Sequence, residues 1–234
     1  MFDADPSRRP APRAALFDVD GTLVDTNDLH AVAWAEALRH FGHDFPVETI
    51  REQIGKGGDN LIPTLLGDIP EAEREALEGF RGTLFKRDYL PRAAPFPGVR
   101  PLFERLAADG VRILLASSSN QDEVAFHLAL IGCEDLVFAT TSRDDAAHSK
   151  PCPDIFEAAL DRAGVAAEEA IVIGDSPWDV LAARRAGLAV IGFRSGGFSD
   201  DALLDGGAIA LFDGPRDLLA RYAASPFARF HAEA

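Results

Sequence analysis

Several residue types that mark common protein classes are scarce in this sequence. Among 234 residues there are two cysteines, one methionine, two tryptophans and two tyrosines. Cys133 and Cys152 are too few for a disulfide framework or a zinc cluster, so we expect free thiols in a reducing cytoplasm. No apolar run reaches the roughly 20 residues that a membrane-spanning helix needs, so we expect no membrane partner.

Basic residues are also in short supply. The chain has 23 Lys and Arg against 38 Asp and Glu, which gives a formal net charge of −15. This surplus disfavours binding to nucleic acid or to an anionic membrane surface. We therefore expect partners among small molecules and divalent cations. The sequence indicates no oligomeric state.

The first 13 residues, MFDADPSRRPAPR, lack the apolar segment of a secretory signal peptide. They are rich in proline and arginine, and we predict that residues 1–13 form a disordered lead-in. In the whole chain 47% of the residues are hydrophobic, which is ample for a packed core. The length favours one large domain with a smaller one.

Six near-continuous apolar stretches predict β-strands that are buried on both faces, as in a parallel sheet. These stretches are residues 14–19, 111–116, 136–140, 170–174, 188–192 and 208–212. Helical patterns lie between most of them. Such an alternation predicts a doubly wound α/β fold.

One long segment interrupts this alternation. From residue 24 to about residue 96 the sequence shows helical periodicity and no convincing strand. We predict that residues 24–95 form a helical cap domain inserted after the first strand. Residues 14–23 and 96–234 would then form the catalytic α/β core.

Polar residues follow four of the predicted strands. Ligands of open parallel sheets bind at the carboxyl ends of the strands, so these residues should meet at one edge. Each alone has an ordinary interpretation as a cap, turn or surface residue, but the joint placement predicts a site. In strand order they are Asp18, Asp20, Gly21 and Thr22; Ser117, Ser118, Ser119 and Asn120; Lys150; and Asp175 and Asp179.

Four segments, FDVDGTLVDT, LLASSS, SKPCPD and IGDSPWD, resemble the ordered motifs of the haloacid dehalogenase superfamily, chiefly its phosphatases and phosphomutases. The resemblance runs from Ala14 to Phe212 and includes the helical insert, where such enzymes carry a cap. It implies a Rossmann-like core and hydrolysis of phosphate esters.

The resemblance also implies a magnesium site. Asp18 and Asp20 lie two residues apart, and like charges that close repel. Asp18 and Asp175 can share a hard divalent cation, so that their mutual repulsion becomes coordination. The backbone carbonyl of Asp20 would be a third protein ligand, and Asp179 would bind through water or orient the other ligands.

Roles in catalysis follow from the same resemblance. Asp18 would attack phosphorus and form an aspartyl phosphate, while Asp20 would protonate the leaving oxygen and later activate water. Lys150 and Ser117 would hold the phosphoryl oxygens. The expected substrate-binding residues are Gly21, Thr22, Ser118, His30 and Lys56.

Two of these residues lie in the predicted cap. Lys56 stands among glycines in the loop GKGGD, where it could approach the substrate. His30 matches in spacing a histidine of β-phosphoglucomutase-like members, in which it helps to engage the general acid. Trp34, one turn further on, is interpreted as cap core.

We therefore expect a magnesium-dependent phosphatase that acts on a sugar phosphate or a phosphoglycolate-like acid. The second acid, Asp20, favours phosphate over halide chemistry because a halide leaving group needs no proton. The first alternative is a β-phosphoglucomutase-like phosphomutase, against which stands the DGTL form of the first motif. The second is a metal- and phosphate-binding module without turnover, which would not need both a nucleophile and an acid.

Overall fold

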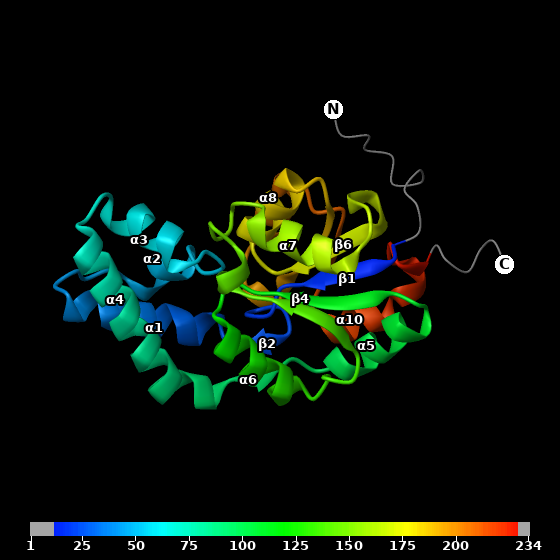
Figure 1. The fold of residues 1–234 in the computed structure, drawn as a ribbon, viewed down its shortest axis with the longest axis horizontal. Coiled ribbons are helices and arrows are strands. Elements are labelled where there is room, and N and C mark those ends of the chain that lie inside the picture. Colours follow the sequence, from blue (N-terminus) through cyan, green and yellow to red (C-terminus); the bar gives the residue numbers. More distant parts are fainter. Residues whose placement is uncertain (1–11, 229–234) are drawn as a thin grey trace.

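The computed structural model describes residues 12–228, so all but the last two residues of the predicted lead-in lie outside the described residues. Figure 1 shows a sheet with helices on both faces and, at one end of it, a group of helices. We call these the sheet part and the helical part (residues 27–92). The six strands are β1 (Ala14–Phe17), β4 (Arg112–Ala116), β5 (Val137–Thr141), β6 (Ala170–Gly174), β7 (Ala189–Phe193) and β8 (Ala210–Phe212).

All neighbouring strands in this sheet are parallel, in the order β5-β4-β1-β6-β7-β8. Alternate residues of β1 point to opposite faces and both faces are buried, which explains the continuous apolar runs. Leu16 packs toward α7 (Asp154–Ala163) and α8 (Pro177–Arg185). Phe17 packs toward α5 (Val99–Ala108), where the centre of its ring lies 4.9 Å from that of Phe103. The predicted doubly wound α/β fold is confirmed.

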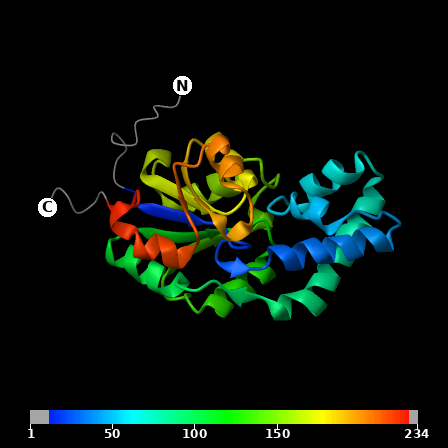
Figure 2. The same cartoon turned by 180° about the vertical axis from the view of Figure 1, so that it is seen from behind.

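The remaining helices of the sheet part complete the two layers. The layer of α5 (Val99–Ala108) also contains α6 (Gln121–Ile131) and α10 (Pro215–Ala220). The layer of α7 and α8 also contains α9 (Asp200–Gly206). Figure 2, which views the molecule from behind, shows the helical part extending beyond one end of the sheet, where the chain leaves the sheet part for the first helix.

The helical part consists of α1 (Asn27–His40), α2 (Val47–Arg51), α3 (Gly58–Leu66) and α4 (Glu71–Leu84). A π-helical turn and a 3-10 turn, Phe85–Tyr89 and Leu90–Arg92, lead back toward the sheet. This part has a small core of its own, to which Trp34, Ile50 and Leu61 contribute.

The prediction that residues 24 to 96 contain no strand is wrong. Val24–Asp25 (β2) and Ala94–Pro95 (β3) pair antiparallel where the chain leaves the sheet part and where it returns. Two-residue strands are too short to show an alternating pattern, and the proline in β3 speaks against a strand. The pair joins the two connections between the parts at one place.

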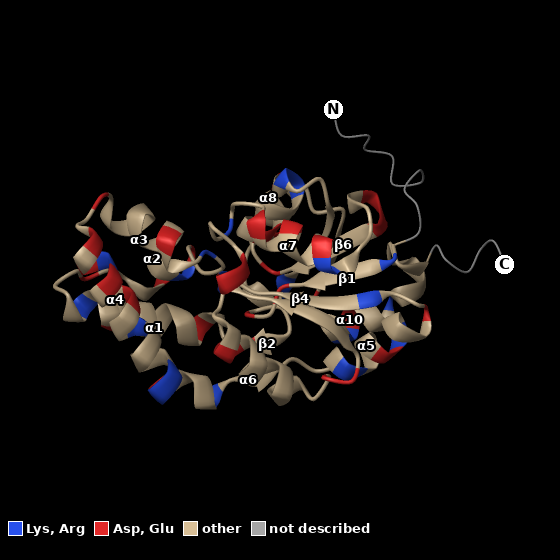
Figure 3. Cartoon of the chain, viewed as in Figure 1, with Lys and Arg blue, Asp and Glu red and all other residues tan. Residues whose placement is uncertain are grey.

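Acidic and basic residues are intermixed along the chain. Figure 3 shows both kinds in the sheet part and in the helical part. Within residues 12–228, no helix combines the length and the apolar character required to cross a membrane.

Candidate active site

Asp18 directly follows β1 at the end of the sheet that faces the helical part, and it is almost completely buried. Lys150 approaches it from the loop before α7, and its ammonium forms an ion pair with Asp18 Oδ1. The same ammonium lies 2.7 Å from Asp179 Oδ1. Only 1% of Lys150 is exposed, so these two carboxylates, rather than water, compensate the charge of its ammonium.

Asp175 follows β6 and is held by two donors. Thr22 Oγ1 donates to its Oδ1 over 2.7 Å, and Asn27 Nδ2 donates to its Oδ2 over 2.8 Å. Gly21 has a positive φ of 79°, and a Cβ there would come within 2.4 Å of Asp175 Oδ2. Glycine is therefore needed at this turn. Thr22, predicted to contact the substrate, is buried against Asp175.

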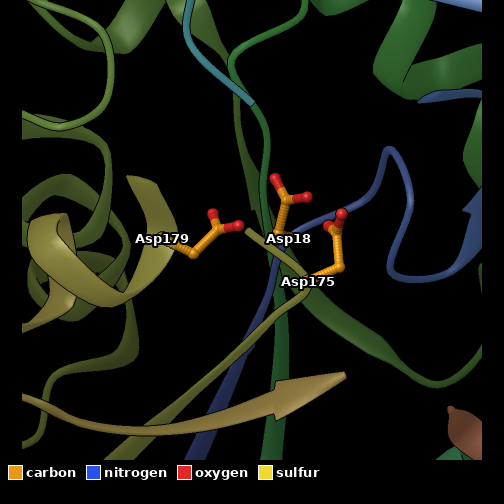
Figure 4. Close-up of side chains that lie close together, drawn as sticks. All are labelled: Asp18, Asp175 and Asp179. Carbon is orange, nitrogen blue, oxygen red and sulfur yellow. The ribbon is translucent and has the colours of Figure 1, made fainter. Parts of the chain in front are cut away.

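Asp179 lies in the first turn of α8, where it serves as part of a capping box. Its Oδ2 accepts from the Ser176 backbone over 3.0 Å and from the Ser176 hydroxyl over 2.5 Å. Oδ1 is left for Lys150 and for the neighbouring carboxylates. Figure 4 shows Asp18, Asp175 and Asp179 gathered at one point.

The three carboxylates form a donor set that fits a divalent cation. One oxygen of each lies within 4.8 Å of the others, and all three residues are buried. Burial and the neighbouring carboxylates raise the pKa of Asp18 well above its usual value, despite the opposing effect of Lys150. Burial and Asp179 raise the pKa of Asp175 to about 7. One lysine does not balance three acids, and hard oxygen ligands suit Mg²⁺.

Asp20 is surrounded by donors from both parts of the molecule. Its Oδ1 accepts from Thr26 Oγ1 over 2.7 Å and lies 2.9 Å from His30 Nε2. Its Oδ2 accepts from Ser119 Oγ over 2.9 Å. Burial alone would raise the pKa of Asp20, but His30, His127 and the hydrogen bonds bring this pKa well below its usual value.

Arg81 sets the tautomer of His30. An arginine NH₂ group of Arg81 contacts His30 Nδ1, and a guanidinium can only donate. His30 Nδ1 is therefore the acceptor, and a neutral ring donates from Nε2 to Asp20. Burial lowers the pKa of His30, which also favours the neutral ring. The ring stacks on Phe85 with centroids 4.0 Å apart.

Arg81 is a half-buried cation whose Nε is a buried, unused donor. Its guanidinium lies 5.1 Å from the ring centre of Trp34 and 4.8 Å from that of Phe85. Within residues 12–228 its Nε has no hydrogen-bond partner. An unpaired buried donor is costly, which favours a ligand at this position.

A cavity of about 110 Å³ lies between the two parts. Its lining includes Asp18, Asp20, His30, Lys56, Arg81 and Ser118. The hydroxyl of Ser118 has no hydrogen-bond partner in the described part of the chain. Ser117 instead lines a neighbouring hollow, and its Oγ accepts from the Ser119 backbone over 3.0 Å.

Lys56 lines the cavity but is anchored within the helical part. Its Nζ donates to Gln53 Oε1 over 2.8 Å and to Thr64 Oγ1 over 3.1 Å. The ammonium also lies 4.0 Å from the ring centre of Trp178. These contacts leave Lys56 at the wall of the cavity with part of its hydrogen-bonding capacity already used.

Sequence reasoning missed several residues of this arrangement. Thr26 and Asn27 stand at the start of α1, where such residues normally cap a helix, yet their side chains serve Asp20 and Asp175. Ser119 was seen only as part of a serine cluster. His127 is fully buried, and its Nε2 lies 3.4 Å from Asp20 Oδ1. No local pattern distinguishes it from a core residue of α6.

Comparisons with known proteins show the family of the chain. The family model for haloacid dehalogenase-like hydrolases matches residues 12–187. A phosphoglycolate phosphatase from Rhodospirillum rubrum is 30% identical over 86% of this chain and 87% of its own. A phosphorylated carbohydrates phosphatase from Thermotoga maritima is 29% identical over 88% and 96%. The solved structure of a hydrolase from Pseudomonas syringae superimposes with a TM-score of 0.86 at 30% identity, covering 92% of this chain and 99% of that one.

Proposed function

Since the chain belongs to the haloacid dehalogenase-like hydrolases and is a phosphoric monoester hydrolase, we propose that it is a magnesium-dependent phosphatase of small phosphorylated metabolites, working through an aspartyl phosphate on Asp18. The observation that carries the proposal is the contact of one buried lysine with Asp18 beside Asp175 and Asp179. Its expected setting is the cytoplasm.

The first half of the reaction forms a bond from a carboxylate oxygen of Asp18 to phosphorus and breaks the bond to the ester oxygen. Asp18, Asp175 and Asp179 would hold the Mg²⁺, which supplies positive charge for the nucleophile and the phosphoryl oxygens. Lys150 orients Asp18 and favours its ionised form. Asp20 is an ionised carboxylate in the described structure, so it must take up a proton before it can protonate the departing oxygen.

The second half hydrolyses the aspartyl phosphate. Asp20, now a carboxylate, takes a proton from water, and the water oxygen attacks phosphorus to release inorganic phosphate and restore Asp18. Thr26, His30 and Ser119 hold both oxygens of Asp20 in place. Ser118 would contact the phosphoryl group from the cavity wall.

The substrate is proposed to be small and to carry a second polar or anionic group. A cavity of about 110 Å³ admits a metabolite the size of phosphoglycolate or a small sugar phosphate. The unpartnered Nε of Arg81 offers a donor to a carboxylate or hydroxyl of that substrate. The names of the relatives from R. rubrum and T. maritima support the same two classes.

A panel of phosphomonoesters tests the proposal. Inorganic phosphate is measured with magnesium, with EDTA, and after magnesium is restored. Multiple turnovers of phosphoglycolate or of a sugar phosphate, lost in EDTA and regained with magnesium, are expected. Undiminished turnover in EDTA, or no release from any ester, would rule out the mechanism.

Phosphomutase activity is the second candidate, and the hydrogen bond of His30 to Asp20 favours it. This contact joins the helical part to the proposed acid, an arrangement suited to keeping water from the intermediate. β-Glucose 1-phosphate, incubated with and without a trace of the 1,6-bisphosphate, separates the two. We expect free phosphate and no need for the bisphosphate; stoichiometric glucose 6-phosphate would establish the mutase instead.

A binding module without turnover is disfavoured. Asp18 and Asp20 are both retained, and each is held by its own set of donors in the described structure. Such a module would bind the phosphomonoesters of the panel and release no inorganic phosphate.

A further inference from the structure

Ser149, the residue before Lys150, is covered by residues 57–60 of the helical part. The backbone N–H of Gly57 donates to Ser149 Oγ over 3.0 Å. The backbone N–H of Ser149 donates to Asp59 Oδ2 over 3.0 Å. Asn60 Nδ2 lies 3.0 Å from both the carbonyl oxygen and the Oγ of Ser149. Every polar group of Ser149 thus meets the helical part.

The geometry of this contact is specific. A Cβ on Gly57 would lie 2.6 Å from Ser149 Cβ, so a larger residue cannot approach in the same way. The carbonyl of Lys150 is also within 3.3 Å of Asn60 Nδ2. Because an amide nitrogen has two hydrogens and all its neighbours here are acceptors, the reversed amide would place oxygen against oxygen.

The loop around Lys150 is also held from the sheet part, where Arg185 Nη1 donates to the carbonyl of Pro151 over 2.6 Å. Lys150 lies in this loop, between the 3-10 turn Arg143–Asp145 and α7, outside any strand or helix. Its ammonium must nevertheless reach Asp18 and Asp179 at once. Contacts that fix the backbone of this loop therefore fix the ammonium as well.

We infer that Asn60 is a positioning residue for Lys150: the helical part, when seated on the sheet part, holds the lysine loop so that the ammonium engages Asp18. The inference rests on the proposed function for its kinetic test. It assigns to residues 57–60 an effect on the chemical step in addition to any contact with substrate.

A purely structural role predicts something different. A contact that only joins the two parts would, when removed, weaken substrate binding, and its effect would not depend on Lys150. The exposed ion pair of Lys86 with Asp122, 3.4 Å long, also joins the two parts and lies away from the cavity. Lys86→Ala is therefore the matched control.

The kinetic experiment compares Asn60→Ala, Asn60→Asp and Lys86→Ala with the wild type on phosphoglycolate and p-nitrophenyl phosphate. Asn60→Ala should lower kcat on the order of 10-fold for both substrates and change KM less than about 2-fold. Asn60→Asp, the same shape without donors, should lower kcat further. Lys86→Ala should match the wild type.

A double-mutant cycle with Lys150→Ala tests whether Asn60 acts through Lys150. If Asn60 acts through Lys150, Asn60→Ala has no further effect in the Lys150→Ala background. An equal fold-loss in both backgrounds, or an unchanged kcat, would overturn the inference. Should Asn60→Ala lose its cooperative unfolding, Ser149→Ala removes only the hydroxyl and should show the same pattern with a smaller loss.

A readout without turnover separates this inference from the proposed function. Lys150 is 1% exposed and should resist acetylation in the wild type. Mass spectrometry should find it acetylated several-fold faster in Asn60→Ala and unchanged in Lys86→Ala. Equal protection in Asn60→Ala and the wild type would overturn the inference even if no phosphatase activity were found.

Discussion

The sheet part and the helical part contribute to the site in different ways. At the sheet edge, charged side chains hold one another directly, as Lys150 holds Asp18 and Asp179. The helical part contacts Asp20 and the lysine loop through neutral groups, namely His30 on Asp20 and Asn60 on a backbone carbonyl, while its cations Lys56 and Arg81 line the cavity. The first arrangement supplies charge for bond making, and the second controls position and access. Substitutions on the two sides should therefore differ in size and kind.

The largest effect should follow removal of the nucleophile. Asp18→Asn keeps the shape of the side chain and removes its charge, so turnover should fall on the order of 10⁴-fold or more while the fold persists. Phosphate release measures the turnover, and circular dichroism measures whether the fold persists. Acid quench or beryllofluoride should place the label on Asp18 in the wild type, and a label on Ser117 would contradict the role given to Asp18.

Two acids of the same edge should differ from each other. Asp175→Ala should raise the magnesium concentration for half-activation on the order of 100-fold. Asp179→Ala should raise it less and lower kcat instead, because Asp179 is also tied to Lys150 and Ser176. Magnesium titrations after EDTA treatment measure both. If both variants raised the magnesium concentration for half-activation equally, the expected difference between Asp175 and Asp179 would be contradicted.

The stability of the metal-free protein should reveal the cost of the buried carboxylates at the sheet edge. The pKa of Asp175 is raised from 3.8 to about 7, so the folded state holds this proton more tightly than the unfolded state. The free energy of unfolding should therefore fall as pH rises from about 4 to about 7. One pKa unit corresponds to about 1.4 kcal/mol, so the expected loss is on the order of 2–4 kcal/mol.

Denaturant titrations in EDTA at several pH values measure this loss against Asp175→Asn. The variant cannot titrate at this position, so it should gain stability relative to the wild type across the same window. Magnesium should restore the wild type more at pH 8 than at pH 5. A pH-independent difference between the two proteins would show that Asp175 is not destabilised in the metal-free fold.

The smallest effect should come from the wall of the cavity on the helical side. Lys56→Ala should raise KM for the preferred metabolite by about 3- to 10-fold and barely change the turnover of p-nitrophenyl phosphate. The anchoring of Lys56 by Gln53 and Thr64 limits the expected loss. A fall in kcat with both substrates would give the helical part a larger share in the chemistry.

The sequence predicts the two parts unequally, for physical reasons. Strands buried on both faces leave continuous apolar runs, and polar residues after them must meet at one edge, so Asp18, Lys150 and Asp175 could be identified. The partners of Asp175 could not, because Thr22 and Asn27 have the composition of an ordinary turn and helix start.

Contacts across the two parts were harder still. Asn60 lies in the first turn of α3 and Ser149 lies in a loop 89 residues further along the chain, so no local pattern connects them. The contact of Arg81 with His30 likewise depends on how α4 packs over α1. Tertiary packing decides such pairs.

The place of β1 in the sheet has a consequence for the synthesis of this protein. β1 is made first, yet its two partners, β4 and β6, are encoded far downstream. While the ribosome is working, Asp18 leaves the exit tunnel long before Lys150 and Asp175 exist. Chains released early therefore carry the proposed nucleophile without the lysine and the acid that complete the site, and such a truncated product lacks the arrangement that the proposed reaction requires.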